Sequence, residues 1–330
     1  MTTFGSEFSD RTTFVTGAYG MLGFWIVKAL LDSGGRVVVL KRDDVRGSAL
    51  ALEGLEGRCD VVRGSITDLP AMDRVIGEYE VDTVFHLAAQ TIVGVANRSP
   101  VPTFETNILG TWNIMEAVRR HGVERTVVAA SDKSYGHHDT LPYQEHFALQ
   151  ARHPYDVSKA CTDLIARSYW HTYEVPVAVT RFANIYGGGD LNRSRLVPEL
   201  VDAVLDGRAP VIRSDGSPER DFLYAEDAAN AYLAIAGALD SGEGRGEAFN
   251  AGGDKPHSVR EMVELLISVA GSDVKADYRG DGVPAGEIDR QFVDSTKLRE
   301  MTGWAPEVGL EEGLRRTVQW YSERPESRQR

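Results

Sequence analysis

A glycine-rich turn near the beginning of the chain constrains the fold most strongly. It joins a short apolar run that ends at Thr16 to an amphipathic stretch typical of a helix, which starts near Met21. Glycine at such a turn lets the backbone approach a pyrophosphate, and the first turn of the helix offers free N–H groups to the anion. A ligand-free turn is the alternative. The position between a strand and a helix favours a dinucleotide cradle, in which the expected cofactor contacts are Gly17, Gly20, Met21, Leu22 and Gly23.

The same alternation of short apolar runs and amphipathic stretches continues through the first half of the chain. Continuous apolar strands between helices indicate a parallel sheet buried on both faces. We therefore expect an α/β chain, with a doubly wound parallel sheet of the Rossmann type and a smaller mixed α/β domain that caps the substrate. Strands are expected at 13–16, 36–40, 58–63, 83–88, 126–130 and 175–181, and helices at 21–33, 106–121, 154–173, 195–205, 258–270 and 310–322.

Charge and cysteine content exclude several classes of partner. The net charge of −13 and the scattered Lys and Arg argue against a nucleic-acid or anionic-membrane surface. Cys59 and Cys161 lack metal-ligand spacing, which fits a reducing compartment. Neither a secretion signal nor a run of 18 apolar residues is found, so we expect a cytoplasmic protein without a membrane span. The neighbouring His137 and His138 are expected to be solvated, and no metal is expected.

The end of the second expected strand leaves the choice of dinucleotide open. A carboxylate in this place usually holds the adenosine ribose hydroxyls. Here Lys41 and Arg42 come first, which favours NADP on charge grounds, while Asp43 keeps NAD open. The two cations are equally well explained as a solvated strand end.

Tyr155 and Lys159 are the expected hydride-transfer pair. They lie four residues apart on an expected helix, so both side chains leave the same face. A neighbouring ammonium and the positive charge of a nicotinamide stabilise phenolate, so we expect a lowered pKa for Tyr155. Tyr155 would then accept a proton from a substrate hydroxyl.

With these motifs together, the chain resembles the extended short-chain dehydrogenase/reductase family, the NAD-dependent nucleotide-sugar epimerases and dehydratases, over nearly its full length. The resemblance implies that Leu87, Ala88 and Ala89 line the cofactor, that Asn107 lies deep beside it, and that Ser131 hydrogen-bonds the reacting sugar hydroxyl. It also implies cofactor contacts at the end of the third strand, from Ser65 and Ile66, where the family often has an Asp before the hydrophobic residue. The matching segments are 16–23, 85–89, 106–111, 131–136, 155–159, 184–189 and 220–227.

Asp132 and Lys133 point to one branch of the family. An acid and an amine after Ser131 resemble the 4,6-dehydratases, and the Asp-Lys pair resembles the CDP-glucose 4,6-dehydratase branch. That resemblance implies an acid that protonates the departing carbon-6 hydroxyl and a base for the carbon-5 proton. A surface ion pair at a strand end is the alternative.

The resemblance also implies an organisation and a set of partners. The expected dinucleotide-binding domain covers 1–180 with about 221–237, and the nucleotide-sugar domain covers 181–220 and 238–330. The expected ligands are a tightly bound NAD, with NADP open, and a nucleotide-diphosphate sugar in a homodimeric 4,6-dehydratase. The alternatives are a 4-epimerase or decarboxylase of the family, and a nonenzymatic dinucleotide-binding subunit. Expected substrate contacts are Gln90, Asn184, Arg195, Leu196, Val197, Arg213, Arg220 and Arg290.

Overall fold

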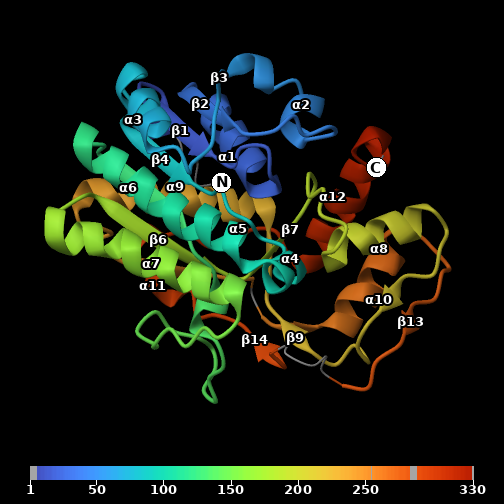
Figure 1. The fold of residues 1–330 in the computed structure, drawn as a ribbon. Coiled ribbons are helices and arrows are strands. Elements are labelled where there is room, and N and C mark those ends of the chain that lie inside the picture. Colours follow the sequence, from blue (N-terminus) through green and yellow to red (C-terminus); the bar gives the residue numbers. More distant parts are fainter. Residues whose placement is uncertain (1–5, 254, 283–287, 329–330) are drawn as a thin grey trace.

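A seven-stranded parallel sheet organises the computed structural model, which describes residues 6–253, 255–282 and 288–328 (Figure 1). The strand order is β3-β2-β1-β4-β5-β6-β11. The chain builds outward from β1 to β3 and then returns to β4, so the topology switches between β1 and β4. In open α/β sheets ligands bind at the carboxyl ends of the strands beside such a switch. The strands are β1 (Thr12–Thr16), β2 (Arg36–Lys41), β3 (Asp60–Arg63), β4 (Thr83–His86), β5 (Arg125–Ala129), β6 (Val177–Phe182) and β11 (Ala248–Ala251).

Helices cover both faces of the sheet. On β2, Val37 and Val39 pack into one core cluster, whereas Val38 and Leu40 pack into the other, as the period of two in a strand requires. The first cluster lies under α1 (Met21–Asp32) and α9 (Ala225–Ser241), and the second under α3 (Leu69–Glu78), α6 (Gly110–His121) and α7 (Pro154–Tyr173). The remaining elements of the first half are η1 (Ser6–Phe8), α2 (Ala49–Leu52), η2 (Glu56–Arg58), α4 (Val93–Arg98), α5 (Pro100–Phe104), the π-helical η3 (Glu105–Leu109) and η4 (Asp132–Tyr135).

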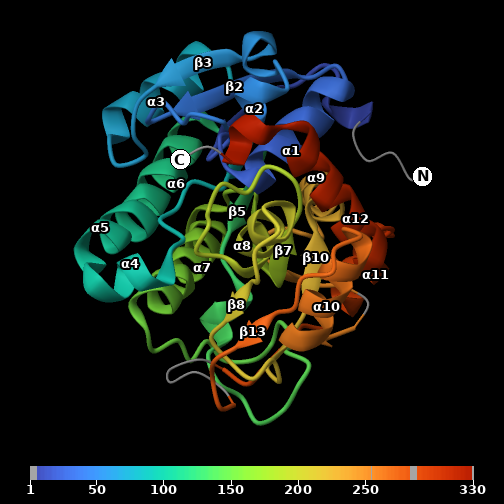
Figure 2. The ribbon, with the colours of Figure 1, turned by 90° about the vertical axis from the view of Figure 1, so that its right-hand side faces the viewer.

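A second group of short strands and helices lies beyond the central sheet. Figures 1 and 2 place β2 and β3 at the upper end of the molecule and β13, with α10, in its lower part. The small sheets pair β10 with β7, β13 with β8, and β9 with both β12 and β14. The elements are β7 (Asn184–Tyr186), α8 (Leu196–Leu205), β8 (Val211–Ile212), β9 (Glu219–Arg220), β10 (Phe222–Tyr224), β12 (His257–Ser258), α10 (Val259–Val269), β13 (Asp277–Tyr278), β14 (Arg290–Gln291), α12 (Leu310–Glu323) and η5 (Pro325–Arg328). The remaining helix, α11 (Thr296–Thr302), packs against α9 and β11 of the central sheet.

The expected fold class is confirmed, with one addition to the sheet. β11 pairs in parallel with β6, from Ala248 beside Val179 to Ala251 beside Phe182. The seventh strand of the central sheet therefore comes from the segment after residue 238. This four-residue strand, A-F-N-A, is too short to stand out from the Gly-rich segments around it. Across the described ranges, no helix is long and apolar enough to cross a membrane.

Candidate active site

The glycine turn has no room for side chains at Gly17 and Gly23. Gly17 has φ +78°, and a Cβ there would lie 2.8 Å from the backbone nitrogen of Ala88. Gly20 precedes α1 without a side-chain hydrogen bond to the helix, so the first N–H groups of α1, at Met21 and Leu22, have no intrahelical acceptor. A Cβ on Gly23 would collide with the Gly17 carbonyl oxygen. These residues fit the pyrophosphate of a dinucleotide.

The end of β4 is fastened to this turn. The Thr16 hydroxyl accepts hydrogen bonds from the backbone N–H groups of Leu87 (3.1 Å) and Ala88 (3.2 Å). The same hydroxyl lies 2.8 Å from Nδ1 of His86, and burial lowers the pKa of His86 to about 3, so this imidazole is neutral. His86 is thus a packed strand residue. The contacts hold 87–89 beside the cradle, where the resemblance places the cofactor.

Asn107 connects the loop after β4 to the helix that carries Tyr155. Its Oδ1 accepts from the backbone N–H of Gln90 (2.8 Å), and its Nδ2 donates to the Gln90 carbonyl (3.0 Å) and to Ser158 Oγ (2.9 Å). The side chain is 1% exposed and lies in the π-helical turn η3, a distortion that is frequent at functional sites. Asn107 therefore fixes the position of α7 relative to the cradle.

Ser131, Asp132 and Tyr155 form one hydrogen-bonded group at the end of β5. Ser131 Oγ donates to Asp132 Oδ1 (3.0 Å), accepts from the Lys133 N–H (3.2 Å), and is hydrogen-bonded to the phenol of Tyr155. Asp132 is 4% exposed, and its Oδ2 has no hydrogen-bond partner within the described residues. Burial raises the pKa of Asp132, against the opposing charge of Lys133.

Tyr155 and Lys159 lie on the first turns of α7, as expected, and without a nicotinamide the pKa of the phenol is raised. Burial raises the pKa of Tyr155 to about 12, and the nearby charge of Arg195 only partly opposes this. Burial also lowers the pKa of Lys159 to about 8, and its Nζ donates to the Ala129 carbonyl (2.7 Å). A cation in addition to those of the protein is needed to favour the phenolate.

Two of the expected substrate arginines face this group. Arg195 precedes α8, and its guanidinium contacts Asp190 Oδ2 (3.1 Å) and Thr91 Oγ1 (3.2 Å). The contact with Thr91 connects the segment before α8 to the loop after β4. Arg220, on β9, donates to the Glu219 and Asp289 carbonyls, and its charge opposes the rise in the pKa of Asp132. The next residues of α8, Leu196 and Val197, are half-buried and buried.

The remaining residues expected to contact substrate or cofactor are exposed or interact with neighbouring residues of the chain. Arg290 is paired with Glu219 (2.6 Å) at an exposed edge, and Arg213 is exposed. The Gln90 side chain hydrogen-bonds both backbone groups of Ile92, and Asn184 Nδ2 donates to the Asp221 carbonyl at 3.4 Å.

The expected cofactor contacts at the ends of β3 and β2 are also engaged within the protein. Ser65 hydrogen-bonds Thr67, while Ile66 packs against Gly110 and its carbonyl accepts from Asn113. Lys41 and Arg42 are each paired with a carboxylate, and Asp43 holds Arg42.

Comparison with known proteins identifies the family. The family model described as "NAD dependent epimerase/dehydratase family" matches residues 13–252. The chain belongs to this family. A dTDP-glucose 4,6-dehydratase from Streptomyces griseus is 33% identical, covering 93% of each chain. A UDP-glucose 4-epimerase from Mycolicibacterium smegmatis is 30% identical, covering 94% of this chain and 98% of the relative. The crystal structure of a dTDP-glucose 4,6-dehydratase from Bacillus anthracis in complex with NAD superposes with a TM-score of 0.84 at 28% identity, over 96% of this chain and 98% of the other.

Within this family fold, Asp221 is a site residue that the sequence analysis missed. Its carboxylate is 2% exposed, accepts from the Gly253 N–H (2.6 Å), and lies near enough to Asp132 for the two charges to interact. Burial raises the pKa of Asp221 to about 7. A carboxylate directly after Arg220 was visible in the sequence, but its burial follows from the packing of the segment around Gly252 against it.

A buried ion pair that anchors α7 was also missed. Arg181 on β6 binds Asp163 on α7 through two hydrogen bonds of 2.7 and 3.0 Å, and both side chains are buried. Arg181 also donates to the hydroxyl of Tyr135 and to the Glu145 carbonyl. Tyr155, Lys159 and Asp163 recur every four residues on one buried face of α7, and this spacing of polar residues was the available signal.

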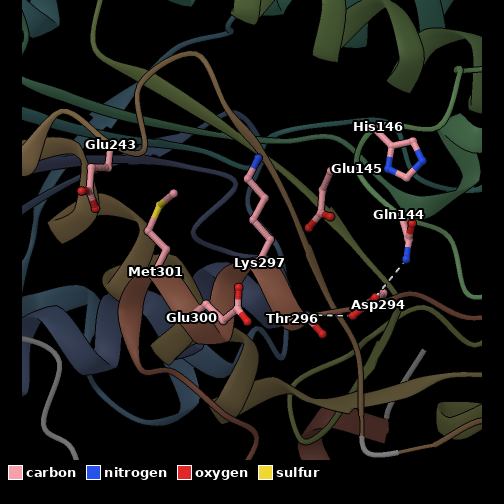
Figure 3. Close-up of a pocket in the computed structure, with 9 residues that line it drawn as sticks. All are labelled: Gln144, Glu145, His146, Glu243, Asp294, Thr296, Lys297, Glu300 and Met301. Atoms are coloured by element: carbon pink, nitrogen blue, oxygen red, sulfur yellow. Dashed lines mark hydrogen bonds between the residues drawn. The ribbon is translucent and has the colours of Figure 1, made fainter.

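A hollow beside α11, separate from this site, is lined mainly by acidic side chains (Figure 3). Carboxylates from the loop before α7 and from α11 line it, and Gln144 donates to Asp294 (3.3 Å). The lining amine, Lys297, is paired with Glu247 outside the hollow. An acidic wall disfavours a diphosphate, so this hollow does not fit the anionic part of a nucleotide sugar. The lining residues are Gln144, Glu145, His146, Glu243, Asp294, Thr296, Lys297, Glu300 and Met301.

Proposed function

We propose that this protein is a nucleotide-sugar 4,6-dehydratase that converts an NDP-hexose to an NDP-4-keto-6-deoxyhexose. The observation that carries the proposal is Asp132, a buried carboxyl group with a raised pKa, joined through Ser131 to Tyr155. Loss of the carbon-6 hydroxyl as water requires an acid at that place, whereas epimerisation at carbon 4 does not.

In this scheme Tyr155, Lys133 and Asp132 each transfer one proton to or from the sugar. Tyr155 accepts the proton of the carbon-4 hydroxyl, and Ser131 hydrogen-bonds that hydroxyl. The resulting ketone acidifies the hydrogen on carbon 5, which Lys133 removes as a proton, while Asp132 protonates the departing carbon-6 hydroxyl. After carbon 6 receives the hydride, Lys133 returns its proton to carbon 5, which completes the 4-keto-6-deoxy sugar. A bound nicotinamide would supply the redox chemistry, as acceptor of the carbon-4 hydride and as its donor to carbon 6, and would add a positive charge beside Tyr155.

The two arginines at the site have the chemistry to hold the substrate's diphosphate. A guanidinium presents a planar fork that grips two phosphate oxygens at once. Arg195 comes from the cap side of the site and Arg220 from β9, so a diphosphate held between them would leave the sugar facing Ser131 and Tyr155. We further propose that NAD stays bound between turnovers and that the enzyme acts as a homodimer, as the family resemblance implies.

A substrate panel tests the proposal. Purified protein is incubated with CDP-, dTDP-, UDP- and GDP-glucose, and products are separated and examined for the alkaline absorbance of a 4-keto-6-deoxy sugar. We expect one base to give this product without added reductant. Conversion of glucose to galactose with no keto product would instead support a 4-epimerase, the activity named for the Mycolicibacterium smegmatis relative.

A further inference from the structure

A cluster of charged side chains joins the carboxyl ends of β2 and β3. Lys41 and Arg63 are register partners in the parallel sheet, so their side chains leave the same face. Two adjacent cations repel each other, and Asp44 relieves this repulsion. Its Oδ1 lies 3.1 Å from Lys41 Nζ and 2.9 Å from Arg63 Nη2. One carboxylate thus balances a cation from each strand.

Glu56 connects this cluster to the glycine turn. Its Oε1 accepts from Lys41 Nζ (2.7 Å) and from the hydroxyl of Tyr19 (2.9 Å), which lies inside the turn. Lys41 Nζ also lies 5.2 Å from the centre of the Tyr19 ring. The hydrogen bonds from Lys41 lower the pKa of Glu56, and those from Arg63 and Lys41 lower that of Asp44, so both carboxylates are ionised at neutral pH.

The cluster lies where a Rossmann fold holds the adenosine ribose. The ribose hydroxyls are usually bound at the end of the second strand, by a carboxylate for NAD or beside a cation for the 2′-phosphate of NADP. Here β2 ends in Lys41, followed by Arg42, which the neighbouring Asp43 pairs at 2.6 Å. Three cations and three carboxylates therefore meet at this point, and the charge that favoured NADP in the sequence is balanced in the structure.

We propose that Asp44 and Glu56 determine cofactor choice: they neutralise Lys41 and Arg63, so the site accepts the ribose 2′-hydroxyl of NAD and rejects the 2′-phosphate of NADP. A 2′-phosphate carries nearly two negative charges at neutral pH and would meet two ionised carboxylates. A hydroxyl can donate to a carboxylate oxygen instead. The inference rests on the proposed function, because that function requires a bound dinucleotide.

A competition experiment tests the assignment without measuring turnover. Protein is equilibrated with an equimolar mixture of NAD and NADP, separated from free nucleotide, and denatured, and the retained dinucleotides are quantified by chromatography. The variants are Asp44→Asn, Glu56→Gln and the double variant. Asp44 is 68% exposed, so its substitution leaves the fold intact even if the Glu56 variant does not fold.

The matched control lies at the other end of the same two strands. Asp60→Asn removes the partner of Arg36 (2.8 Å), an exposed pair between the first residues of β3 and β2. We expect wild type and Asp60→Asn to retain mainly NAD, and the double variant to shift the ratio toward NADP by on the order of tenfold or more.

The possible failures are distinguishable. Equal retention of NADP by wild type, or a double variant with the wild-type ratio, overturns the role of Asp44 and Glu56 and leaves the proposed function intact. Retention of neither nucleotide by wild type overturns the proposed function together with this inference.

Discussion

At the scale of single residues, the site depends on polar side chains that the fold keeps away from water. Burial raises the pKa of Tyr155, Asp132 and Asp221, and it lowers the pKa of Lys159. Each shift favours the neutral form of its group. The raised pKa of Asp132 suits the proton donor that we propose, whereas Tyr155 needs a further cation before it can accept a proton.

Tyr155→Phe removes one hydroxyl from a buried ring and leaves the cradle untouched. We expect product formation to fall by roughly 10²–10⁴-fold, the usual contribution of a positioned acid or base, with NAD still retained. Turnover and retained nucleotide are measured on the same preparation. Tyr173→Phe, at the exposed end of the same helix, is the control, and comparable rates for the two variants would remove Tyr155 from the mechanism.

Asp132→Asn and Lys133→Ala should impair elimination more than oxidation. Both variants keep Ser131 and Tyr155, so reduced nicotinamide should accumulate on mixing with substrate while the keto product forms slowly. Stopped-flow absorbance follows the first step and chromatography the second. Asp139→Asn, a fully exposed carboxylate in the loop that follows, is the control. Wild-type product rates in both variants would exclude the dehydratase roles.

Asp221 makes stability depend on pH. Its pKa is about 7 in the folded protein and near 4 when unfolded, so between these values the folded state binds more protons and stability falls as pH rises. Asp221→Asn removes this loss. We expect its stability relative to wild type to improve by roughly 2–3 kcal/mol between pH 5 and pH 8 in urea unfolding. Parallel pH profiles for the two proteins would contradict the shift.

At the scale of elements, the turn between β1 and α1 is held against the end of β4, and α7 is held from two sides. Asn107 fixes α7 near Ser158, and Arg181 binds it at Asp163. The cradle and the catalytic helix therefore belong to one hydrogen-bonded frame, which keeps Tyr155 at a fixed place relative to Gly17.

Gly17→Ala tests the close contact between the glycine turn and the backbone after β4. Its Cβ would press on the backbone of Leu87 and Ala88, and φ +78° disfavours any L side chain. We expect a loss of roughly 2–4 kcal/mol in the free energy of unfolding and loss of NAD retention. Gly122→Ala, with φ +64° and open space around it, should cost only about 1 kcal/mol. Equal losses for the two variants would show that the contact with β4 is unimportant.

At the scale of the whole molecule, local patterns predicted most of the sheet and the helix α7. The starts of β1, α1 and α7 follow from apolar runs, the glycine turn and Pro154, which are encoded within a few residues. The balance of Lys41 by Glu56, the burial of Asp221 and the pairing of β11 with β6 depend on contacts between distant segments. No local pattern carries that information.

One core cluster runs through both halves of the chain, from Phe8 under the sheet to Trp304 and Tyr321 in the last segments. We therefore expect a single cooperative transition in calorimetry, with equal calorimetric and van't Hoff enthalpies in the protein with NAD bound and a lower Tm without it. Two separated transitions, each assigned by proteolysis to one half, would show that the halves fold independently.

The pairing of β11 with β6 has a consequence during translation. Until Ala251 leaves the ribosome, the apolar strand from Val177 to Phe182 has one unpaired edge, and translation of the intervening segment takes on the order of seconds. An exposed apolar edge is a template for association with other nascent chains. Slow synthesis between these strands should therefore lower the yield of native enzyme, and chaperones that cover this edge should restore it.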